Sequence, residues 1–507
     1  MEEGITLVLR EHRIEVNKGK LANKSRYFAS LFSHNFNDSH SKEHILNYDI
    51  DLCTLQNFVN WICNESHQDI GHYKIKDFMT KFLEKNFAEL LNLLQLSVLF
   101  MVDELTHDIV EVIVYCWLLP DTVIDVWLLA QDLNVKILQD ICFSFCLDRF
   151  EELPISSLIE LTKDNVIKLV GNVNVRSSTQ YLCRVRTEWT KHNTVSEIPN
   201  VKSDRQPKFI RGTLILETNK DNVDVANVYT WRDNVLSKCV ELKNIQGPNF
   251  TVRGFQGLIG MQIASRGFNI YTVGGEMGLG IGQFNEIILR YCLLFKKWFY
   301  LTRLPSPRRH MVTVFLKNKL VVAGGVGKHR LKLFTVDIFN IHTGKWETGA
   351  KVPESFTDVP PHCVLEGKLF LMKSFLYIYD PDSNHWQTVS ISNNFAVQSV
   401  DALLTDATAL SFIGNCKGET VVSKVEIVNG AICEKEECPK EFVERVVIDD
   451  IDIVHEDDSC RLRYVKVADV GIMIVNTHCE NKHRYLNLRS KIRRDFENVT
   501  IPKLNCF

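Results

Sequence analysis

The sequence predicts a multidomain chain with an α+β domain first, an all-α domain in the middle and an all-β propeller at the C-terminal end. Three observations support this fold class. Over roughly the first 200 residues, apolar side chains recur mainly at helical spacing, after an opening pair of alternating strands. From about residue 205 the pattern changes to short strands separated by loops. These strands repeat in six units, each too small to bury its own hydrophobic face, which predicts blades packed in a ring.

The opening strands and helices predict the α+β domain. Residues 5–16 form two alternating runs around a polar turn, which is typical of a hairpin. Ser25 stands where an N-cap is needed, just before an apolar helical stripe. Ile45 and Leu46 mark a short strand, and apolar residues then recur at helical spacing over 52–62. This order predicts a small sheet with helices packed against it.

A run of amphipathic helices predicts the all-α domain. It extends over 87–150, interrupted by proline, and continues in two helical stretches over 155–170 and 177–191. A polar stretch with two prolines, 191–207, then predicts a linker. We therefore place the three domains at residues 1–117, 118–200 and 205–507.

Length and composition fit a protein made of globular domains. At about 150 residues per domain, 507 residues correspond to roughly three domains. The chain is 45% hydrophobic and 24% charged, which argues against a largely disordered protein. Because 59 Lys and Arg nearly balance 62 Asp and Glu, the basic excess of a nucleic-acid-binding protein is missing. We expect no nucleic-acid partner.

The opening segment, the two most apolar stretches and the cysteines predict an intracellular protein. The opening segment MEEGITLVLREHR lacks the basic and then apolar order of a secretory signal. The two most apolar stretches, 90–102 and 109–130, are broken by polar residues, so we expect no membrane partner. Fifteen cysteines without a CxxC pair fit free thiols better than a zinc site. We expect a cytoplasmic location, with the nucleus as the alternative, and neither metal nor cofactor.

Three of the six repeats are well formed. In each, an apolar strand is followed by an aromatic residue and, seven positions after it, by a tryptophan. IYTVGG at 270–275 precedes Tyr291 and Trp298, LVVAGG at 320–325 precedes Phe339 and Trp346, and LFLMKS at 369–374 precedes Tyr379 and Trp386. The paired glycines fit a strand end where the backbone has no room for a side chain, and we expect the tryptophan to pack between blades.

Three weaker copies flank the well-formed repeats. TLILET at 213–218 precedes Tyr229, with Leu236 in the tryptophan slot, and LSFIGN at 410–415 precedes Val425, with Ile432 in that slot. GIMIVN at 471–476 precedes Phe496 and Ile501-Pro502. Only two of the six units keep both glycines, so the repeats are degenerate. Six blades is the predicted number, with five or seven as alternatives.

Each of the three domains resembles a known family. The glycine pair followed by Tyr-x6-Trp resembles the Kelch repeat of about 50 residues. The segment LANKSRYFASLF at 21–32 resembles the BTB/POZ domain, with Asn17 in place of the family's histidine. The segment DVWLLAQ at 125–131 resembles the start of a BACK domain, and Trp189 resembles part of its closing helix. In this order the domains resemble the BTB–BACK–Kelch, or Kelch-like, family.

The resemblance implies a substrate-recognition adaptor of a cullin-3 RING ubiquitin ligase, with no catalytic residues of its own. The BTB and BACK domains would bind cullin-3, and the propeller would bind an unknown protein substrate. The family's hydrophobic-x-Glu cullin motif falls on Phe36 and Asp38, whose carboxylate is one methylene shorter than the family's glutamate. The family also self-associates through its BTB domain, where members carry a helix and a swapped strand; here four residues precede Ile5.

The resemblance also points to loops of the propeller as the substrate site. Family propellers use the loops that precede their inner strands, and one such loop contains Arg308, Arg309 and His310. An arginine pair suits an acidic or phosphorylated peptide. The alternative is a solvated charge without a ligand, and the next such loop, 358–362, is not basic.

Other functions stay open on the sequence alone. The main alternative is a BTB–Kelch scaffold that binds cytoskeletal or other proteins without a cullin, and a copper-binding oxidase propeller is a third. Two glycine-rich segments, 274–282 and 324–329, resemble phosphate-binding loops. The first is followed by a strand instead of a helix, and the second lacks the first glycine and the Ser/Thr of the motif. We expect that the chain is not an enzyme.

Overall fold

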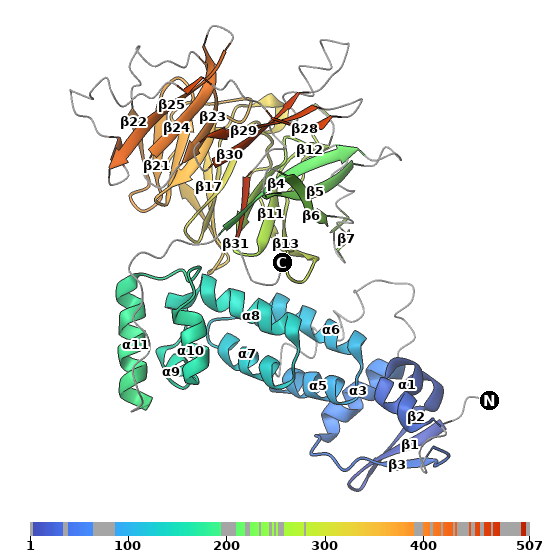
Figure 1. Cartoon of the computed structure of the whole chain (residues 1–507). Coiled ribbons are helices and arrows are strands. Elements are labelled where there is room, and N and C mark those ends of the chain that lie inside the picture. The colour runs from blue at the N-terminus through green and yellow to red at the C-terminus, as the bar shows by residue number, and fades with distance from the viewer. Residues whose placement is uncertain are drawn as a thin grey trace. The chain divides into compact units, whose positions relative to one another are not determined.

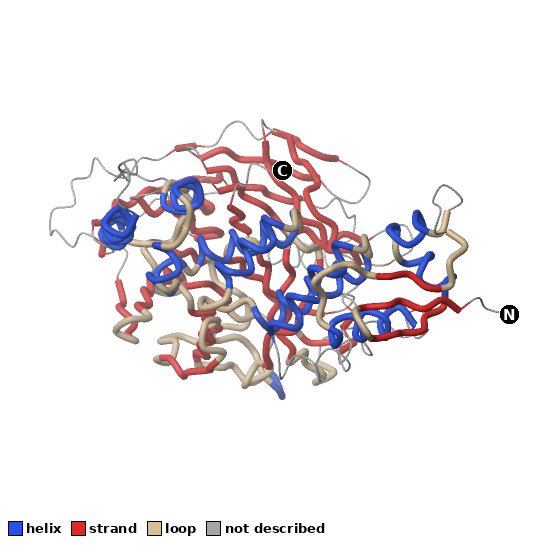
Figure 2. Tube along the Cα trace, turned by 90° about the horizontal axis from the view of Figure 1, so that it is seen from below, coloured by secondary structure: helices blue, strands red, loops and turns tan. Residues whose placement is uncertain are grey.

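The computed structural model describes the parts of the chain that follow. They are residues 4–33, 39–63, 87–193, 209–218, 224–232, 235–242, 246–247, 250–251, 258–277, 280–389, 399–405, 409–416, 419–428, 431–432, 446–447, 452–456, 461–467, 470–476 and 498–502. The chain divides into two compact units, one of residues 1–208 with 247–249 and one of residues 209–246 with 250–507. The described helices of the first unit and strands of the second are drawn blue and red in Figure 2.

A three-stranded sheet opens the first unit. Strand β1 (Gly4–Leu9) pairs antiparallel with β2 (His12–Asn17) and parallel with β3 (Glu43–Ile45), in the order β2-β1-β3. Alternate side chains of β1 are buried, since Ile5, Leu7 and Leu9 are each no more than 2% exposed. The hairpin predicted over 5–16 is therefore confirmed.

Helices accompany this sheet, as expected for an α+β domain, and the first and third of them contact β2. They are α1 (Lys18–Lys24), α2 (Arg26–Leu31), α3 (Leu52–Cys63), α5 (Phe87–Leu99) and α6 (Asp103–Val112). Ser25 is the predicted N-cap of α2: its Oγ accepts a 3.1 Å hydrogen bond from the Phe28 amide and donates a 2.6 Å bond to the Phe100 carbonyl. Phe28 and Phe58 both contact the Phe100 ring, at centroid distances of 4.9 and 5.2 Å. These contacts join three helical segments in one aromatic core.

The middle region is helical throughout. After the π-helical turn Ile113–Trp117 come α7 (Val123–Asp132), α8 (Lys136–Asp148), a 3-10 turn (Phe150–Glu152), α9 (Ile155–Ile159), α10 (Lys163–Val170) and α11 (Thr179–Asn193). Trp189 of α11 is buried and donates a 2.8 Å hydrogen bond from Nε1 to the Leu161 carbonyl. This contact fixes the last helix to the turn after α9.

Two details of this unit bear on the sequence predictions. Cys142 and Cys146 of α8 are free thiols and fully buried, and burial raises the pKa of both. They therefore pack as apolar side chains and are protected from reaction. Within the described residues, no helix combines the length and the apolar character that crossing a bilayer requires.

Antiparallel sheets make up the second unit (Figure 1). Three of these sheets have four strands each and follow one another in the chain. They comprise β10 (Gln262–Arg266), β11 (Asn269–Val273), β13 (Ile287–Cys292) and β14 (Lys297–Arg303); β15 (Val312–Leu316), β16 (Lys319–Ala323), β17 (Val336–Asn340) and β18 (Lys345–Gly349); and β19 (His362–Leu365), β20 (Lys368–Met372), β21 (Leu376–Asp380) and β22 (His385–Val389). In each sheet the strands pair in chain order.

Three further sheets belong to the described part of this unit. One joins β31 (Asn498–Pro502) to β4 (Phe209–Thr218), β5 (Asp224–Arg232) and β6 (Val235–Leu242); one comprises β23 (Ser399–Thr405), β24 (Ala409–Cys416), β25 (Glu419–Val428), β26 (Ala431–Ile432) and β27 (Val446–Val447); and one comprises β28 (Asp452–Glu456), β29 (Arg461–Val467) and β30 (Val470–Asn476). Two short ribbons, β7 (Gln246–Gly247) with β8 (Phe250–Thr251) and β9 (Leu258–Ile259) with β12 (Glu276–Met277), complete the described strands. The sheet of β31 and β4 thus joins the last described strand to the first strand of the unit.

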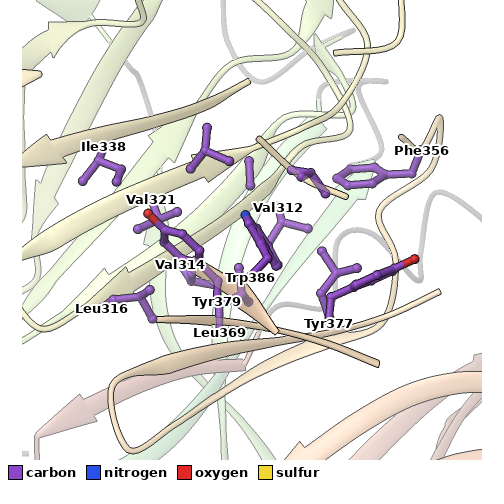
Figure 3. Close-up of a cluster of buried hydrophobic side chains, with 14 residues drawn as sticks. Val312, Val314, Leu316, Val321, Ile338, Phe356, Leu369, Tyr377, Tyr379 and Trp386 are labelled. Carbon is purple, nitrogen blue, oxygen red and sulfur yellow. The ribbon is translucent and has the colours of Figure 1, made fainter. Parts of the chain in front are cut away.

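Neighbouring sheets share hydrophobic cores. In Figure 3, Val312 and Val314 of β15 face Leu369, Tyr379 and Trp386 of the following sheet. A second cluster joins the preceding sheet to β16 and β17, and a third joins β20 and β21 to β23 and β24. The four consecutive sheets from β10 to β24 therefore bury hydrophobic side chains against one another, as the repeat pattern predicts.

The aromatic–tryptophan spacing sets the register of the last hairpin in each well-formed repeat. Residues seven positions apart lie directly opposite each other across a short turn, and the structure pairs Tyr291 with Trp298, Phe339 with Trp346 and Tyr379 with Trp386. Their ring centroids are 5.0, 5.1 and 4.9 Å apart. The predicted repeat is confirmed at these three sheets.

The weaker copies have a different register. Leu236 lies opposite Trp231 instead of Tyr229, and Ile432 lies opposite Ile427 instead of Val425. Both hairpins are tighter than the well-formed ones, because no aromatic–tryptophan pair fixes the longer turn. The assignment of the tryptophan slot to Leu236 and Ile432 in these two units was therefore wrong. Phe496 lies outside the described residues.

The glycine pair of the β15–β18 sheet lies where the loop between β18 and β19 approaches the backbone closely. Gly324 and Gly325 have φ of +63° and +90°, and a Cβ on Gly324 would lie 2.5 Å from Phe356 Cζ. In the next sheet the same place holds Lys373 and Ser374, and Lys373 instead pairs with Glu354 at 3.0 Å. The loss of glycine in that repeat is compensated by polar contacts to the same incoming loop.

Candidate functional site

An exposed apolar patch lies on the first unit, around Phe100. The patch consists of Tyr48, Leu99 and Met101, which are 37%, 38% and 50% exposed, whereas Phe100, between the last two in the chain, is fully buried. The Tyr48 ring meets the Phe100 ring edge-on at 6.0 Å, and its hydroxyl lies 3.2 Å from that of Tyr27. Burial, followed by the hydrogen bond to Tyr48, raises the pKa of Tyr27 to about 12. We call these three exposed residues the Phe100 patch.

A charged pair borders the Phe100 patch. Arg26 donates two hydrogen bonds to Asp103, at 2.9 and 2.8 Å, and its backbone amide contacts the Met101 carbonyl at 3.4 Å. Both side chains are more than 70% exposed. An ion pair this exposed contributes little to stability, so its charges remain available to a partner. The patch and its charged border together have the character of a protein-binding surface.

Arg308, predicted to face a substrate, is fully buried in the second unit. Its guanidinium donates to the carbonyls of Gly324 and Thr335, at 3.2 and 3.0 Å, and forms an ion pair with Asp337. It thereby connects the loop before β15 to the end of β16 and the start of β17. This differs from the solvent-facing position that the sequence suggested, because the neighbouring strands provide a carboxylate and two carbonyl oxygens for the cation.

Arg309 and His310 are also inside the unit. Arg309 Nε lies 2.8 Å from Glu276 Oε2, and Glu276 in turn accepts a 2.8 Å hydrogen bond from the Gly282 amide. The His310 ring packs where a side chain on Gly260 would clash with it, and the His310 amide donates to the Gly260 carbonyl at 2.8 Å. All three predicted substrate residues are therefore buried and do not form an open surface: Arg308 braces its own sheet, and Arg309 and His310 contact residues that precede this sheet in the chain.

Two family models match the chain. The model described as the BTB/POZ domain matches residues 4–106, and the Kelch motif model matches residues 307–353, which contain the whole sheet β15–β18. The chain is a BTB–Kelch protein. No curated protein matches it.

BTB and Kelch domains are typically non-catalytic modules that bind other proteins. The candidate sites of this BTB–Kelch protein are therefore its exposed surfaces. Among the residues whose side chains are described, no group of three or more His, Cys, Asp and Glu is arranged to hold a metal ion. Phe36 and Asp38, predicted to bind the cullin, lie outside the described part of the chain. The segment that contains them is followed by Ser39, whose carbonyl accepts a hydrogen bond from Lys18 at 3.4 Å.

Sequence reasoning missed a second exposed surface of this BTB–Kelch protein. The segment KHRLKLF at 328–334 presents four basic residues and two large apolar ones to solvent. Only its first two residues belong to the glycine-rich segment 324–329, which does not match a phosphate-binding motif. The basic and apolar residues that follow the glycine pair after two intervening residues are the signal that could have identified this surface.

Proposed function

We propose that this BTB–Kelch protein is the substrate-recognition adaptor of a cullin-3 RING ubiquitin ligase. The observation that carries the proposal is the presence of a BTB/POZ domain at 4–106 and a Kelch motif at 307–353 in one chain. An adaptor needs no catalytic residue, because holding the substrate beside the charged E2 raises its effective concentration. The domain order is typical of cullin-3 adaptors.

The BTB domain supplies the cullin contact in this proposal. Phe36 would enter an apolar pocket of the cullin, and Asp38 would pair with a cation beside it. The Phe100 patch and the Arg26–Asp103 pair support the proposal, since they add apolar and charged surface to the same domain. We propose that helices α7–α11 form the BACK domain, with boundaries at 118–200, between a BTB domain at 1–117 and a propeller at 205–507.

The second unit is proposed to be a six-bladed propeller. Support comes from its six described sheets and from the order in which their first strands make contact, which is β31, β10, β15, β19 and β23. The pairing of β31 with β4 connects the end of the unit to its beginning and would close such a ring. The propeller would bind the substrate through its loops. Arg308, Arg309 and His310 would then act by holding a loop in position, since they are buried.

One observation favours the second candidate, a scaffold that binds other proteins without a cullin. The carboxylate of Asp38 is one methylene shorter than the glutamate of the family motif, which would weaken a charge contact of fixed geometry. Under this alternative, removal of the Phe36 ring would change no cullin interaction.

Titration calorimetry of the full chain with the cullin-3 N-terminal domain tests the proposal. We expect binding by the wild type and a loss of affinity in Phe36→Ala, because truncating an aromatic anchor in a buried pocket typically costs at least about 2 kcal/mol. Phe375→Ala is the matched control, since it makes the same substitution at a phenylalanine of the second unit that is 44% exposed. A folded wild type that does not bind the cullin would overturn the adaptor proposal.

A further inference from the structure

The surface formed by 328–334, here called the basic loop, lies between β16 and β17 of the sheet that matches the Kelch motif. It begins with the 3-10 turn Lys328–Arg330. The turn is closed by two backbone hydrogen bonds, from the Gly327 amide to the Leu331 carbonyl at 2.9 Å and from the Leu331 amide to the Lys328 carbonyl at 3.2 Å. The basic loop is thus a defined turn with its side chains directed outward.

The basic loop concentrates positive charge on a chain whose net charge is −3. Lys328, His329, Arg330 and Lys332 are all exposed. No carboxylate in the described part of the chain forms an ion pair with any of these four side chains. Arg308 and Arg309, which lie nearby in the sequence, are neutralised by Asp337 and Glu276. The exposed cations are therefore the ones that can attract an acidic partner.

Apolar side chains are interleaved with these charges. Leu331 and Phe334 are 61% and 43% exposed, and Ile281 in the loop of the preceding sheet is 65% exposed. Arg330 connects the two loops, because its Nη2 lies 3.4 Å from the place of a Cβ on Gly280, next to Ile281. These three apolar residues are most of the large exposed hydrophobic side chains found in the described part of the second unit. One surface of mixed basic and apolar character therefore spans two neighbouring sheets.

The backbone of the basic loop is held in a costly conformation. His329 and Arg330 have φ of +55° and +57°, a region that side chains other than glycine seldom adopt. Such strain persists where the surroundings fix the backbone, and it is concentrated at functional sites. Here Val326 bridges both to Lys332 and to Arg309, whose side chain is held by Glu276. The buried pair of Arg309 and Glu276 thus preorganises the loop that presents the exposed cations.

We propose that the basic loop, together with Ile281, binds an acidic peptide segment of the substrate that carries apolar side chains. The proposal rests on the proposed function and names the chemistry of its substrate. Carboxylates would pair with Lys328, Arg330 and Lys332, and apolar side chains would pack between Leu331 and Ile281. A preorganised loop loses little conformational entropy on binding, which favours affinity. An anionic bilayer is a poorer fit, because it would repel a chain of net negative charge.

The test uses fluorescence anisotropy of the full chain with a short labelled peptide of alternating glutamate and leucine. We compare Lys328→Ser/Lys332→Ser with the control Lys296→Ser/Lys345→Ser, which removes two exposed lysines, one from the β13–β14 turn and one from the start of β18. We expect the loop variant to bind about fivefold to tenfold more weakly, as the loss of two charge pairs predicts, and the control to bind as the wild type does. Leu331→Ser should weaken the binding of this peptide but not the binding of a peptide of alternating glutamate and serine.

Several results would overturn the inference. They are no binding of the glutamate–leucine peptide, equal binding by the loop variant and the control, or loop-dependent binding to phosphatidylserine vesicles without peptide binding. Titration of the same variants with cullin-3 separates this inference from the adaptor proposal. If the chain binds the peptide through the basic loop but does not bind cullin-3, the result would support this inference and overturn the adaptor proposal. If the chain binds cullin-3 but not the peptide, the result would support the adaptor proposal and overturn this inference.

Discussion

Trp386 lies directly opposite Tyr379 in the β21–β22 hairpin, with ring centroids 4.9 Å apart, and donates a 2.9 Å hydrogen bond to the Ala350 carbonyl at the end of the preceding sheet. Trp346 repeats the arrangement one sheet earlier, opposite Phe339, and donates to Thr302 Oγ1 at 3.2 Å. Each tryptophan therefore fixes its own hairpin and also connects its sheet to the one before.

Truncation of Trp386 should destabilise the second unit. The side chain is 7% exposed and belongs to the core between two sheets, so Trp386→Ala should cost about 3 to 5 kcal/mol. Trp386→Phe keeps most of the packing and loses the hydrogen bond to Ala350, so it should cost less. Thermal unfolding, monitored by fluorescence, ranks the stabilities of the wild type and the two variants. An alanine variant as stable as the phenylalanine variant would contradict the packing role.

The buried pair of Arg308 and Asp337 should show strong coupling. Arg308→Met leaves a buried carboxylate unpaired, and Asp337→Leu leaves a buried guanidinium unpaired, so each should cost about 3 to 5 kcal/mol. The double variant should recover much of the loss, since no isolated charge remains. Denaturant unfolding of the four proteins gives the coupling energy. Additive losses would show that the two groups act independently.

Gly324 and Gly344 provide a matched test of the close approach between sheets. Their φ values, +63° and +68°, are nearly equal, but a Cβ on Gly344 meets nothing within 4 Å, whereas one on Gly324 collides with Phe356. Both alanine variants should lose about 1 kcal/mol from backbone strain. Gly324→Ala should lose more in melting temperature, and equal losses would show that the contact with Phe356 relaxes freely.

Glu354 should make the stability of the second unit depend on acid pH. Burial alone would raise its pKa, but hydrogen bonds from Lys373 and Ser374 outweigh this and lower it. The ionised carboxylate therefore stabilises the folded state above the pKa of an unfolded glutamate, about 4.3, and this contribution is lost as pH falls through the lowered pKa. Melting temperatures of Glu354→Gln should change less with acid pH than those of the exposed control Glu366→Gln. If the melting temperatures of the two variants changed equally with pH, the ionised Glu354 carboxylate would not contribute to stability.

Local sequence patterns predicted the strands, hairpins and helix caps. Contacts between residues distant in the sequence determine which of the predicted site residues are exposed. The seven-residue spacing predicted the Tyr379–Trp386 pairing because a short antiparallel turn fixes which residues lie opposite each other. The N-cap at Ser25 was equally local. The burial of Arg308 was not predictable, since it depends on Asp337 of β17 and on the Gly324 and Thr335 carbonyls, which only the folded sheet brings to it. The exposure of Leu331 likewise follows from a turn that no repeat pattern encodes.

Ubiquitylation in a reconstituted reaction tests the central claim most directly. The full chain would be mixed with the cullin-3–RING complex, E1, a ubiquitin-conjugating E2 and ubiquitin, and its own lysines would serve as acceptors held close to the E2. An adaptor predicts cullin-dependent ubiquitylation of the wild type and of Phe375→Ala, and a marked loss in Phe36→Ala. No cullin-dependent modification of a folded wild type, or equal modification of all three proteins, would contradict the account.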